Sequence, residues 1–433
     1  QTGSTMNQAW IRADQILDSW QDIRWDVDYT AHPLLDPELL DGPSRLGRFL
    51  QLTYQRIRED DDAYHREAAR LVRPLRAGAT EIPPCADDVV IVAEFLAEAD
   101  VYLQSTVDLL PEWARPAVRS RPEITACNDL RELMGLALST DDRRLRFEAL
   151  RKIHLANLLL DIDHSRHVQD GPLHLTYFQE MLDRELWCFK SQQYPVQIGF
   201  HMDDDGETIR YTNRPRPGDQ VWHFDSEFLE SRAPGRPVAL DVLYHSCRFK
   251  RSVDRVSYEV IDGQHKVIEK VRWQEMKQHR SGSILSKMLR KGINNPDEIG
   301  DILGAMFIVP DEDALDDLLG LLDAGIGNPF GWRNVTDSLG RVRSGSPLNP
   351  QSSQVFRVFK GDVDVLFPGR FPGQSPYRFT VEIQIHTLES FLRTVCGAHH
   401  ANHVALKLRQ FLMGLVPVLL PARVYGTGWL ERV

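Results

Sequence analysis

The stretch Tyr377–Thr387, YRFTVEIQIHT, shows how the C-terminal half of the chain is built. Polar and apolar side chains alternate along it without a break, with Phe379, Val381, Ile383 and Ile385 set between Thr380, Glu382, Gln384 and His386. A period of two predicts a β-strand with one apolar face and one polar face. The polar face either meets solvent at the edge of a sheet or places Glu382, Gln384 and His386 in one cleft.

Composition and charge limit the class of protein. With 433 residues, 42% hydrophobic and 26% charged, we expect a soluble globular chain of two or three domains. The 62 acidic and 51 basic residues give a net charge of −11, which argues against broad nucleic-acid binding. The longest apolar run, residues 411–420, is too short to cross a membrane, so we expect no membrane partner. Five scattered cysteines without a CxxC pair indicate a reducing, cytoplasmic setting.

The pattern of predicted elements changes along the chain. Residues 6–190 read as a helical domain, residues 191–240 as a β-rich connector, and residues 241–433 as strands that alternate with helices. The predicted fold class is therefore α+β, with a mixed sheet flanked by helices after the helical domain. The main expected elements are a hairpin (195–201 and 207–212), helices (87–110, 141–163, 283–291 and 312–323), strands (302–309, 354–359 and 363–367) and a long irregular segment (324–353).

A basic helix is predicted around residues 283–291. Ser283, Lys287 and Lys291 are spaced at i, i+4 and i+8, so they share one face of this helix. A hydroxyl and cations near free backbone N–H groups at a helix N-terminus can bind an anion. The alternative is an ordinary basic surface helix.

Two carboxylates and a histidine-rich helix are further candidates. Asp301 directly precedes the predicted strand 302–309, a position suited to Mg²⁺, which often needs one or two carboxylates plus substrate phosphates. The alternative is an exposed aspartate in a turn. Glu382 is a candidate second metal ligand or a general base for a hydroxyl nucleophile. His403 and Lys407 lie one helical turn apart and suit phosphate contact better than zinc, which needs more ligands.

The order of these motifs resembles the synthetase domain of the RelA/SpoT family. A Ser-Ile-x-x-Lys-Met-x-Arg-Lys-Gly helix is followed by Asp-Ile-x-Gly, by Val-Glu-Ile-Gln-Ile-x-Thr and by a His-rich helix with a downstream lysine. The resemblance covers residues 240–415 and implies a nucleotidyltransferase-like fold. It also implies Mg²⁺-dependent transfer of pyrophosphate from ATP to the 3′-hydroxyl of GDP or GTP. Some members are toxins that modify adenine nucleotides or the 3′ end of tRNA.

The resemblance also implies roles for individual residues. Asp301 would bind Mg²⁺, and Glu382 would bind Mg²⁺ or activate the attacking hydroxyl with Gln384 beside it. The donor phosphates would be held by basic and hydroxyl groups: Lys277, His279, Arg280, Ser283, Lys287 and Lys291, with His403 and Lys407. The family's Arg-x-Lys motif corresponds either to Lys277 and His279 or to Arg248 and Lys250, which stand about thirty residues earlier.

Two departures affect the acceptor side. Met306 stands where the family has an arginine, and NPQSSQ at 349–354 replaces its Gly-Tyr-x-Ser-x-His acceptor loop. The expected function is therefore a pyrophosphokinase with a divergent nucleotide acceptor. The alternatives are an inactive nucleotide-sensing or partner-binding domain, or toxin-type pyrophosphorylation of adenine nucleotides or of tRNA 3′ ends. The acidic charge disfavours the RNA acceptor alone. The helical half lacks the family's hydrolase His-Asp dipeptide, and autoinhibition, partner binding and neutralisation of a toxic activity all stay open for it.

Overall fold

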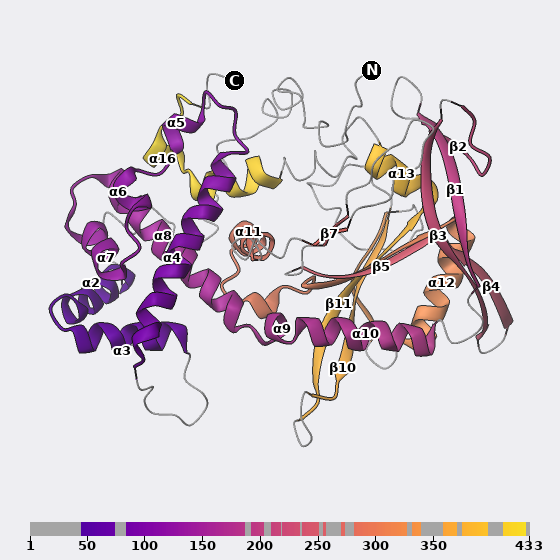
Figure 1. Cartoon of the computed structure of the whole chain (residues 1–433), viewed down its shortest axis with the longest axis horizontal. Helices are drawn as coiled ribbons and strands as arrows, with labels where there is room; N and C mark the ends of the chain where they lie inside the picture. Colours follow the sequence, from indigo (N-terminus) through magenta and orange to yellow (C-terminus); the bar gives the residue numbers. More distant parts are fainter. Residues whose placement is uncertain are drawn as a thin grey trace. The chain divides into compact units, whose positions relative to one another are not determined.

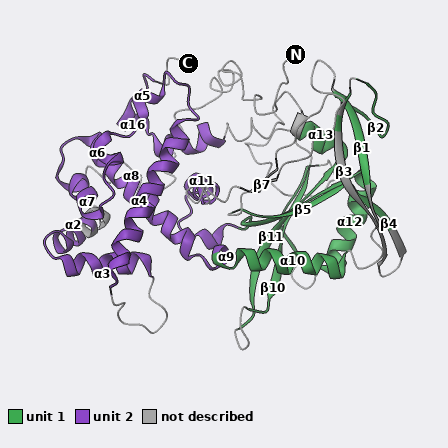
Figure 2. Ribbon diagram, in the orientation of Figure 1, with its two compact units in different colours: residues 1–12, 169–274, 300–408 green, residues 13–168, 275–299, 409–433 purple. Residues whose placement is uncertain are grey.

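The chain forms two compact units that interleave along the sequence (Figures 1 and 2). We call residues 169–274 and 300–408, with 1–12, the sheet unit, and residues 13–168, 275–299 and 409–433 the helical unit. The computed structural model describes residues 45–73, 84–186, 192–202, 209–217, 219–233, 236–250, 254–256, 270–272, 281–326, 331–338, 358–369, 375–396 and 410–429. Each predicted domain is one continuous stretch of sequence, whereas each of these units combines three separate stretches. The roles of the predicted domains stay a prediction.

The helical unit is built around α4 (Ala86–Val107) and α8 (Arg143–His164). Helix α4 is mostly apolar, whereas α8 buries the charged side chains Glu148, Arg151 and Lys152 beside its apolar residues. Aspartates cap several of its helices; Asp142, for example, accepts hydrogen bonds from the backbone N–H groups of Arg144 and Leu145. The surrounding elements are α2 (Arg45–Ile57), α3 (Asp61–Val72), α5 (Arg115–Val118), α6 (Pro122–Thr125), α7 (Leu130–Ser139) and α9 (Arg166–Gln169).

Helix α11 (Gly282–Lys291), the predicted basic helix, belongs to the helical unit. It buries Ile284, Leu285, Met288 and Leu289 on one face. The Tyr102 hydroxyl of α4 and the Ser286 hydroxyl form a 2.8 Å hydrogen bond, and the helix ends at Gly292 in the left-handed conformation that favours glycine. A short 3₁₀ turn, η5 (Pro296–Glu298), follows. Sequence position places α11 with the strands that follow it, but its apolar face packs within the helical unit.

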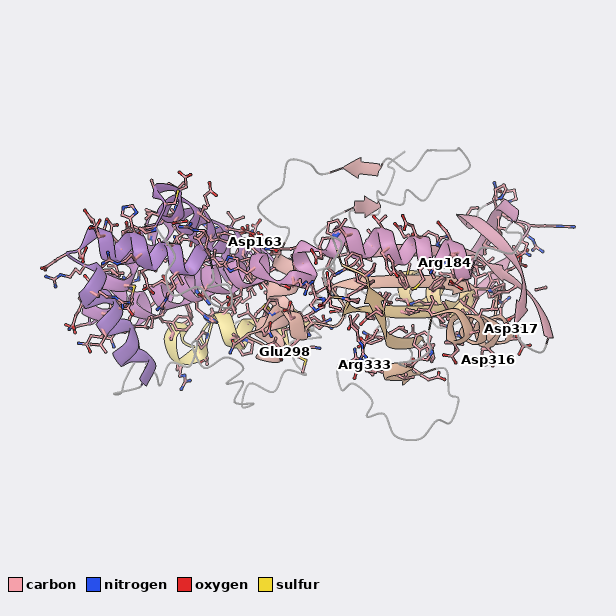
Figure 3. All side chains as sticks on the ribbon, turned by 90° about the horizontal axis from the view of Figure 1, so that it is seen from below. Asp163, Arg184, Glu298, Asp316, Asp317 and Arg333 are labelled. Carbon is pink, nitrogen blue, oxygen red and sulfur yellow. The ribbon has the colours of Figure 1, made fainter. Side chains whose placement is uncertain are left out.

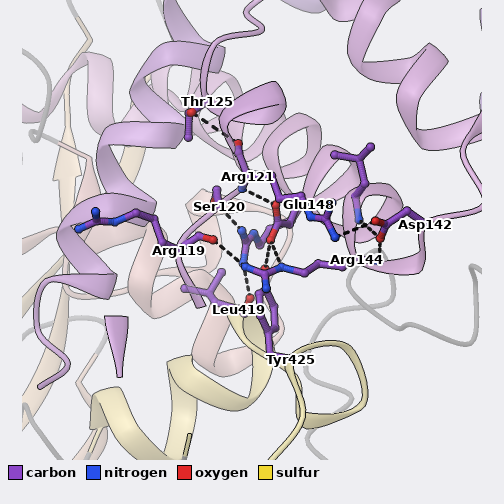
Figure 4. Close-up of polar contacts among 11 residues, drawn as sticks. Arg119, Ser120, Arg121, Thr125, Asp142, Arg144, Glu148, Leu419 and Tyr425 are labelled. Atoms are coloured by element: carbon purple, nitrogen blue, oxygen red, sulfur yellow. Dashed lines mark hydrogen bonds and ion pairs between the residues drawn. The ribbon is translucent and has the colours of Figure 1, made fainter. Parts of the chain in front are cut away.

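The C-terminal segment is tied to α8 by a buried charge network (Figure 4). Glu148 is fully buried and accepts hydrogen bonds from Arg144 Nε (2.8 Å), the backbone N–H of Arg121 (2.7 Å) and the Tyr425 hydroxyl (3.0 Å). Arg151, also buried, donates to the carbonyl oxygen of Leu419 (2.6 Å) and to the Ser120 hydroxyl. The segment consists of η6 (Phe411–Leu415), α15 (Val416–Leu419) and α16 (Ala422–Tyr425).

The sheet unit contains a five-stranded mixed sheet in the order β5-β8-β11-β10-β9. Strands β8 and β11 run parallel, and the other neighbours are antiparallel. The strands are β5 (Tyr244–Phe249), β8 (Leu303–Val309), β9 (Trp332–Asp337), β10 (Phe359–Phe367) and β11 (Tyr377–Thr387). Helix α10 (Gly171–Glu185) covers the apolar face, where the His174 ring stacks on Phe379 with centroids 4.3 Å apart. Helix α12 (Glu312–Gly325) packs on β8 and β11.

A second, antiparallel sheet in the order β2-β1-β3-β4 lies against the opposite face of the first. Its strands are β1 (Gln192–Met202), β2 (Ile209–Thr212), β3 (Gln220–Ala233) and β4 (Arg236–Val242). Ile198 and Phe200 of β1 form an apolar cluster with Ile308 of β8 and with Leu388, Phe391 and Leu392 of α13 (Leu388–Cys396). The cluster covers only one end of the first sheet. A separate antiparallel pair comprises β6 (Asp254–Val256) and β7 (Lys270–Arg272).

Most predicted elements of the C-terminal half are confirmed, and the α+β class is confirmed by the mixed helix and sheet content. Strand β11 spans the whole of the quoted stretch, and the predicted hairpin is the β1–β2 pair. The prediction of an irregular segment at 324–353 was wrong in part, because it contains β9. Strand β3 was not predicted, and β10 contains the predicted strand 363–367. Of the other predicted strand, 354–359, only Phe359 lies in β10, and residues 354–357 lie outside the described residues. No helix among the described residues is long and apolar enough to cross a membrane.

The buried network predicts that the Tyr425 hydroxyl stabilises the fold. Tyr425→Phe removes one donor from the fully buried Glu148 carboxylate. We expect the free energy of unfolding to fall by about 1–3 kcal/mol, the usual cost of losing a hydrogen bond to a buried charged group. Urea denaturation followed by circular dichroism measures it, with Tyr211→Phe, at an exposed tyrosine, as the matched control. Equal stability of the two variants would contradict this role for the network.

Candidate functional site

A row of polar side chains crosses the five-stranded sheet on the face opposite α10. Cross-strand partners in this row share one face of the sheet because side chains alternate along each strand. The row consists of Arg248 (β5), Glu382 (β11), Asp362 (β10) and Arg333 (β9), and Gly304 of β8 lies between Arg248 and Glu382 without a side chain of its own. Arg333, at one end, is labelled in Figure 3. The register therefore brings residues from five separate strands onto one surface.

Asp301 lies just before β8, at the edge of this surface, and is buried. The backbone N–H of Lys250 donates to the carbonyl oxygen of Ile302 (2.9 Å), which places Lys250 beside Asp301. The Lys250 ammonium group forms an ion pair with Asp301 Oδ2. Lys250 is thus a cation in direct contact with the predicted metal ligand.

Glu382, at the centre of the row, is held by two side chains. Gln384 Nε2 donates to its Oε1 (2.7 Å), and Lys360 of β10 forms an ion pair with its Oε2. Lys360 lies opposite Gln384 in the β10–β11 register, so both partners approach from the same side. The predicted pairing of Glu382 with Gln384 agrees with this geometry, whereas Lys360 was not predicted.

Asp362 adds a carboxylate that the sequence reasoning missed. It lies directly opposite Glu382, is 7% exposed, and its Oδ2 accepts a 2.8 Å hydrogen bond from Asn334 Nδ2. Burial raises the pKa of Asp362, and the nearby charges of Glu382 and Asp301 raise it further, against the lowering effect of Asn334 and Lys360. The alternation of Lys360, Asp362 and Asp364 was a signal for a polar strand face, but it did not reveal the partner strand.

The carboxylates fit a magnesium site that the substrate completes. Asp301 and Glu382 present oxygen ligands, the type that Mg²⁺ prefers, and a dication there would relieve the repulsion that these two carboxylates exert on Asp362. Within the described ranges, no group of three or more His, Cys, Asp or Glu side chains could hold a metal ion alone. Magnesium commonly takes one or two carboxylates together with phosphate oxygens and water, so this finding agrees with such a site.

His386 does not join Glu382 in the cleft, which corrects one of the two interpretations of the polar face. It is 3% exposed, and its ring meets Phe391 of α13 edge-on at 6.2 Å. The apolar cluster under β1 and α13 covers this end of the strand, while Glu382 and Gln384 lie beyond it. Burial lowers the pKa of His386 to about 4, so the ring is neutral at pH 7.

The other predicted residues lie in three different places. Arg248 is exposed on β5, at the edge of the five-stranded sheet. Met306 lies opposite Gln384 and packs against the apolar cluster. Ser283, Lys287 and Lys291 are on α11 in the helical unit. Five further residues and the acceptor-loop segment lie outside the described residues: Lys277, His279, Arg280, His403, Lys407 and 349–354.

The neutral state of His386 predicts a pH dependence of stability. The unfolded chain takes up a proton at this residue near the ordinary pKa of about 6.5, whereas the folded chain does so only near 4. The free energy of unfolding should therefore fall as the pH drops from 6.5 toward 4, and the fall should be smaller in His386→Gln. Denaturation at several pH values measures the slope. Titration of the folded-state His386 ring near pH 6.5 by NMR would contradict the expectation.

Comparison with known proteins gives matches among solved structures alone. No protein-family model matches, and no curated protein matches. Small alarmone synthetase 1 from Bacillus subtilis bound to its product pppGpp is 20% identical, over 35% of this chain and 74% of that chain, with a TM-score of 0.22. Another structure of that synthetase is 22% identical, over 35% and 76% of the two chains (TM-score 0.21). A GTP pyrophosphokinase family protein from Streptococcus pneumoniae is 19% identical, over 34% and 70% (TM-score 0.19). The chain is thus similar to such proteins over about a third of its length.

Proposed function

We propose that the chain is a Mg²⁺-dependent pyrophosphokinase that transfers a diphosphate from ATP to the 3′-hydroxyl of a nucleotide acceptor. The observation that supports it is the set of buried carboxylates on one sheet face, Asp301, Glu382 and Asp362, flanked by Lys250 and Lys360. Acids for a metal ion and cations for phosphates are thereby combined on one surface. The order of sequence motifs that resembles the RelA/SpoT synthetases gives the same reaction class.

The chemistry of phosphoryl groups suits this arrangement. Transfer depends mainly on positioning and on neutralising negative charge, with little covalent participation by the protein. Asp301 and Glu382 would hold Mg²⁺, which supplies charge neutralisation on the donor phosphates. Lys250 and Lys360, which are paired with those carboxylates here, would bind phosphate oxygens. Gln384 orients Glu382 through its hydrogen bond.

Of the two candidates for the Arg-x-Lys motif, we favour Arg248 and Lys250. Arg248 lies near the end of β5, beside β8, and Lys250 directly follows that strand and contacts Asp301. Further donor contacts proposed from the resemblance are those of Ser283, Lys287 and Lys291 on α11, and of Lys277, His279, Arg280, His403 and Lys407. The proposed acceptor is a nucleotide such as GDP or GTP. An adenine nucleotide or a tRNA 3′ end stays an alternative acceptor, because Met306 and residues 349–354 differ from the family pattern on the acceptor side.

A second candidate function is nucleotide sensing without turnover. The ion pairs Lys250–Asp301 and Lys360–Glu382 neutralise both proposed metal ligands from within the chain. A site that keeps these pairs could bind ATP without transferring its diphosphate. The two functions differ in whether label leaves ATP for an acceptor.

Label transfer tests the proposed function. The full chain is incubated with ATP labelled at the γ-phosphate, Mg²⁺ and, in separate reactions, GDP, GTP, AMP, ADP or tRNA. We expect label on at least one acceptor with release of AMP, and its loss when EDTA removes the metal. ATP binding without transfer to any acceptor would favour the sensor and overturn the enzyme.

Asp301→Asn tests the metal assignment. Removing one charged ligand should lower transfer by about 100-fold or more, in the range found when a single electrostatic contact to the transition state is lost. Raising the Mg²⁺ concentration should restore part of the activity. Asp316→Asn, at an exposed position of α12 labelled in Figure 3, is the control for the loss of a negative charge. Transfer by Asp301→Asn at the level of this control would contradict the assignment.

Lys250→Met distinguishes the two locations of the Arg-x-Lys motif. A hydrogen bond to a charged group contributes about 1.5–3 kcal/mol, so its loss should raise the Kd of α,β-methylene-ATP with Mg²⁺ by about tenfold or more. This analogue is suitable because its α–β bridge cannot be cleaved by transfer. Lys277→Met should leave the Kd within about twofold. The reverse pattern in titration calorimetry would assign the motif to residues 277–280.

A further inference from the structure

We infer that Asp362 binds the hydroxyl group of the acceptor and takes its proton during transfer. This role rests on the proposed function and adds to it a residue on the acceptor side of the site. It differs from the roles of Asp301 and Glu382, which are directed to the metal ion and the donor.

Asp362 lies within the same small area as the two proposed metal ligands. It is the direct antiparallel partner of Glu382, so both side chains emerge on the polar face of the sheet. On its other side is the backbone just before Asp301: a Cβ atom added to Gly300 would lie 3.3 Å from Asp362 Oδ2. Asp362 is therefore close enough to a metal-bound donor for a hydroxyl between them to meet both.

The partners of the three carboxylates differ in charge. Asp301 pairs with Lys250, and Glu382 pairs with Lys360 and also accepts from Gln384. Asp362 instead accepts from the neutral amide of Asn334, and no described lysine or arginine forms an ion pair with it. A carboxylate held by an amide keeps its negative charge available to a hydroxyl proton, whereas one paired with an ammonium group is already neutralised.

The backbone of Asn334 supports this arrangement. Asn334 has a φ of +50° and is the only non-glycine residue with a positive φ in the described part of the chain. Such a conformation is unfavourable for a residue that carries a Cβ atom, and it persists where the surrounding structure requires it. The β9–β10 register also shifts between Lys360 and Asp362, beside this residue. The strained residue places its amide on Oδ2, and no described residue donates a hydrogen bond to Oδ1.

The proposed step uses Oδ1 of Asp362. The acceptor oxygen attacks the β-phosphorus of ATP, and a new O–P bond forms while the acceptor O–H bond breaks. The proton moves to Asp362 Oδ1. The bond between the β-phosphorus and the oxygen bridging to the α-phosphate breaks, and AMP leaves with that electron pair. The diphosphate is then on the acceptor, and Asp362 returns its proton to solvent before the next turnover.

Asp362→Asn tests this role, with Asp364→Asn as the matched control. Asp364 is on the same strand and face, but Arg333 and Thr380 already hold it. The acceptor is whichever of GDP, GTP, AMP, ADP or tRNA the wild-type chain labels. We expect Asp362→Asn to lower kcat by about 100-fold or more, as for removal of a general base. The Kd of Mg²⁺ with α,β-methylene-ATP should stay within about twofold, because the donor contacts are kept. Asp364→Asn should change neither quantity by more than about twofold.

Asn334→Gly provides a second variant if Asp362→Asn does not fold, as judged by circular dichroism. Glycine accepts a positive φ without strain, so this change removes the amide and keeps the backbone. We expect kcat to fall by about tenfold or more and the donor Kd to stay unchanged, since the carboxylate loses its orientation. Unchanged kcat in Asn334→Gly overturns the inference as well.

The outcomes separate this inference from the proposed function. No transfer by the wild-type chain to any acceptor overturns both. Transfer by the wild-type chain with a normal kcat in Asp362→Asn overturns the inference alone. A parallel rise in the donor Kd of Asp362→Asn would place the residue on the metal and donor, which also overturns it.

Discussion

Mutual repulsion between carboxylates on a buried sheet face is the constraint on which the site depends. Burial raises the pKa of Asp362, and the nearby charges of Glu382 and Asp301 raise it further. Unpaired charges in such a place would cost several kcal/mol each (order of magnitude). The chain offsets this cost with Lys250, Lys360 and an amide from a strained residue on β9. These partners compensate the negative charges in the structure described. When Mg²⁺ and ATP bind, the carboxylates would contact the metal ion, and the two lysines would contact the phosphates.

The strands next to this site could be predicted because their patterns are local. The alternation over Tyr377–Thr387 predicted strand β11 with Glu382 on its polar face. The position of Asp301 directly before residues 302–309 predicted the second carboxylate of the site, beside β8. Asp362 could not be found this way, since its significance depends on the register that sets it opposite Glu382. Register is decided by long-range pairing, and the segment between β9 and β10 contains no pattern that specifies it. Strand β9 was missed for a different reason: it is a short edge strand with turn-forming neighbours, so its periodic signal is weak.

His386 and α11 show where tertiary packing overrides a local pattern. Periodicity places His386 on the same face as Glu382, yet β1 and α13 cover one end of that face with apolar side chains. For α11, the one-sided set of apolar residues predicts that the helix packs against something, but not against α4 and the C-terminal segment. A local pattern thus predicts whether a segment is a helix or a strand better than it predicts what the segment packs against. The packing partner depends on residues distant in sequence.

The interleaved units have a consequence for the order in which the parts of the chain are synthesised. Glu148 and Arg151 on α8 are made before the sheet unit, whereas their partners Tyr425 and Leu419 are made after it. All strands of the candidate site are synthesised between these two parts of the helical unit. The core of the helical unit is therefore closed by a segment that follows the sheet unit in the sequence. A product truncated before this segment would contain every carboxylate of the site and still lack the partners of Glu148 and Arg151.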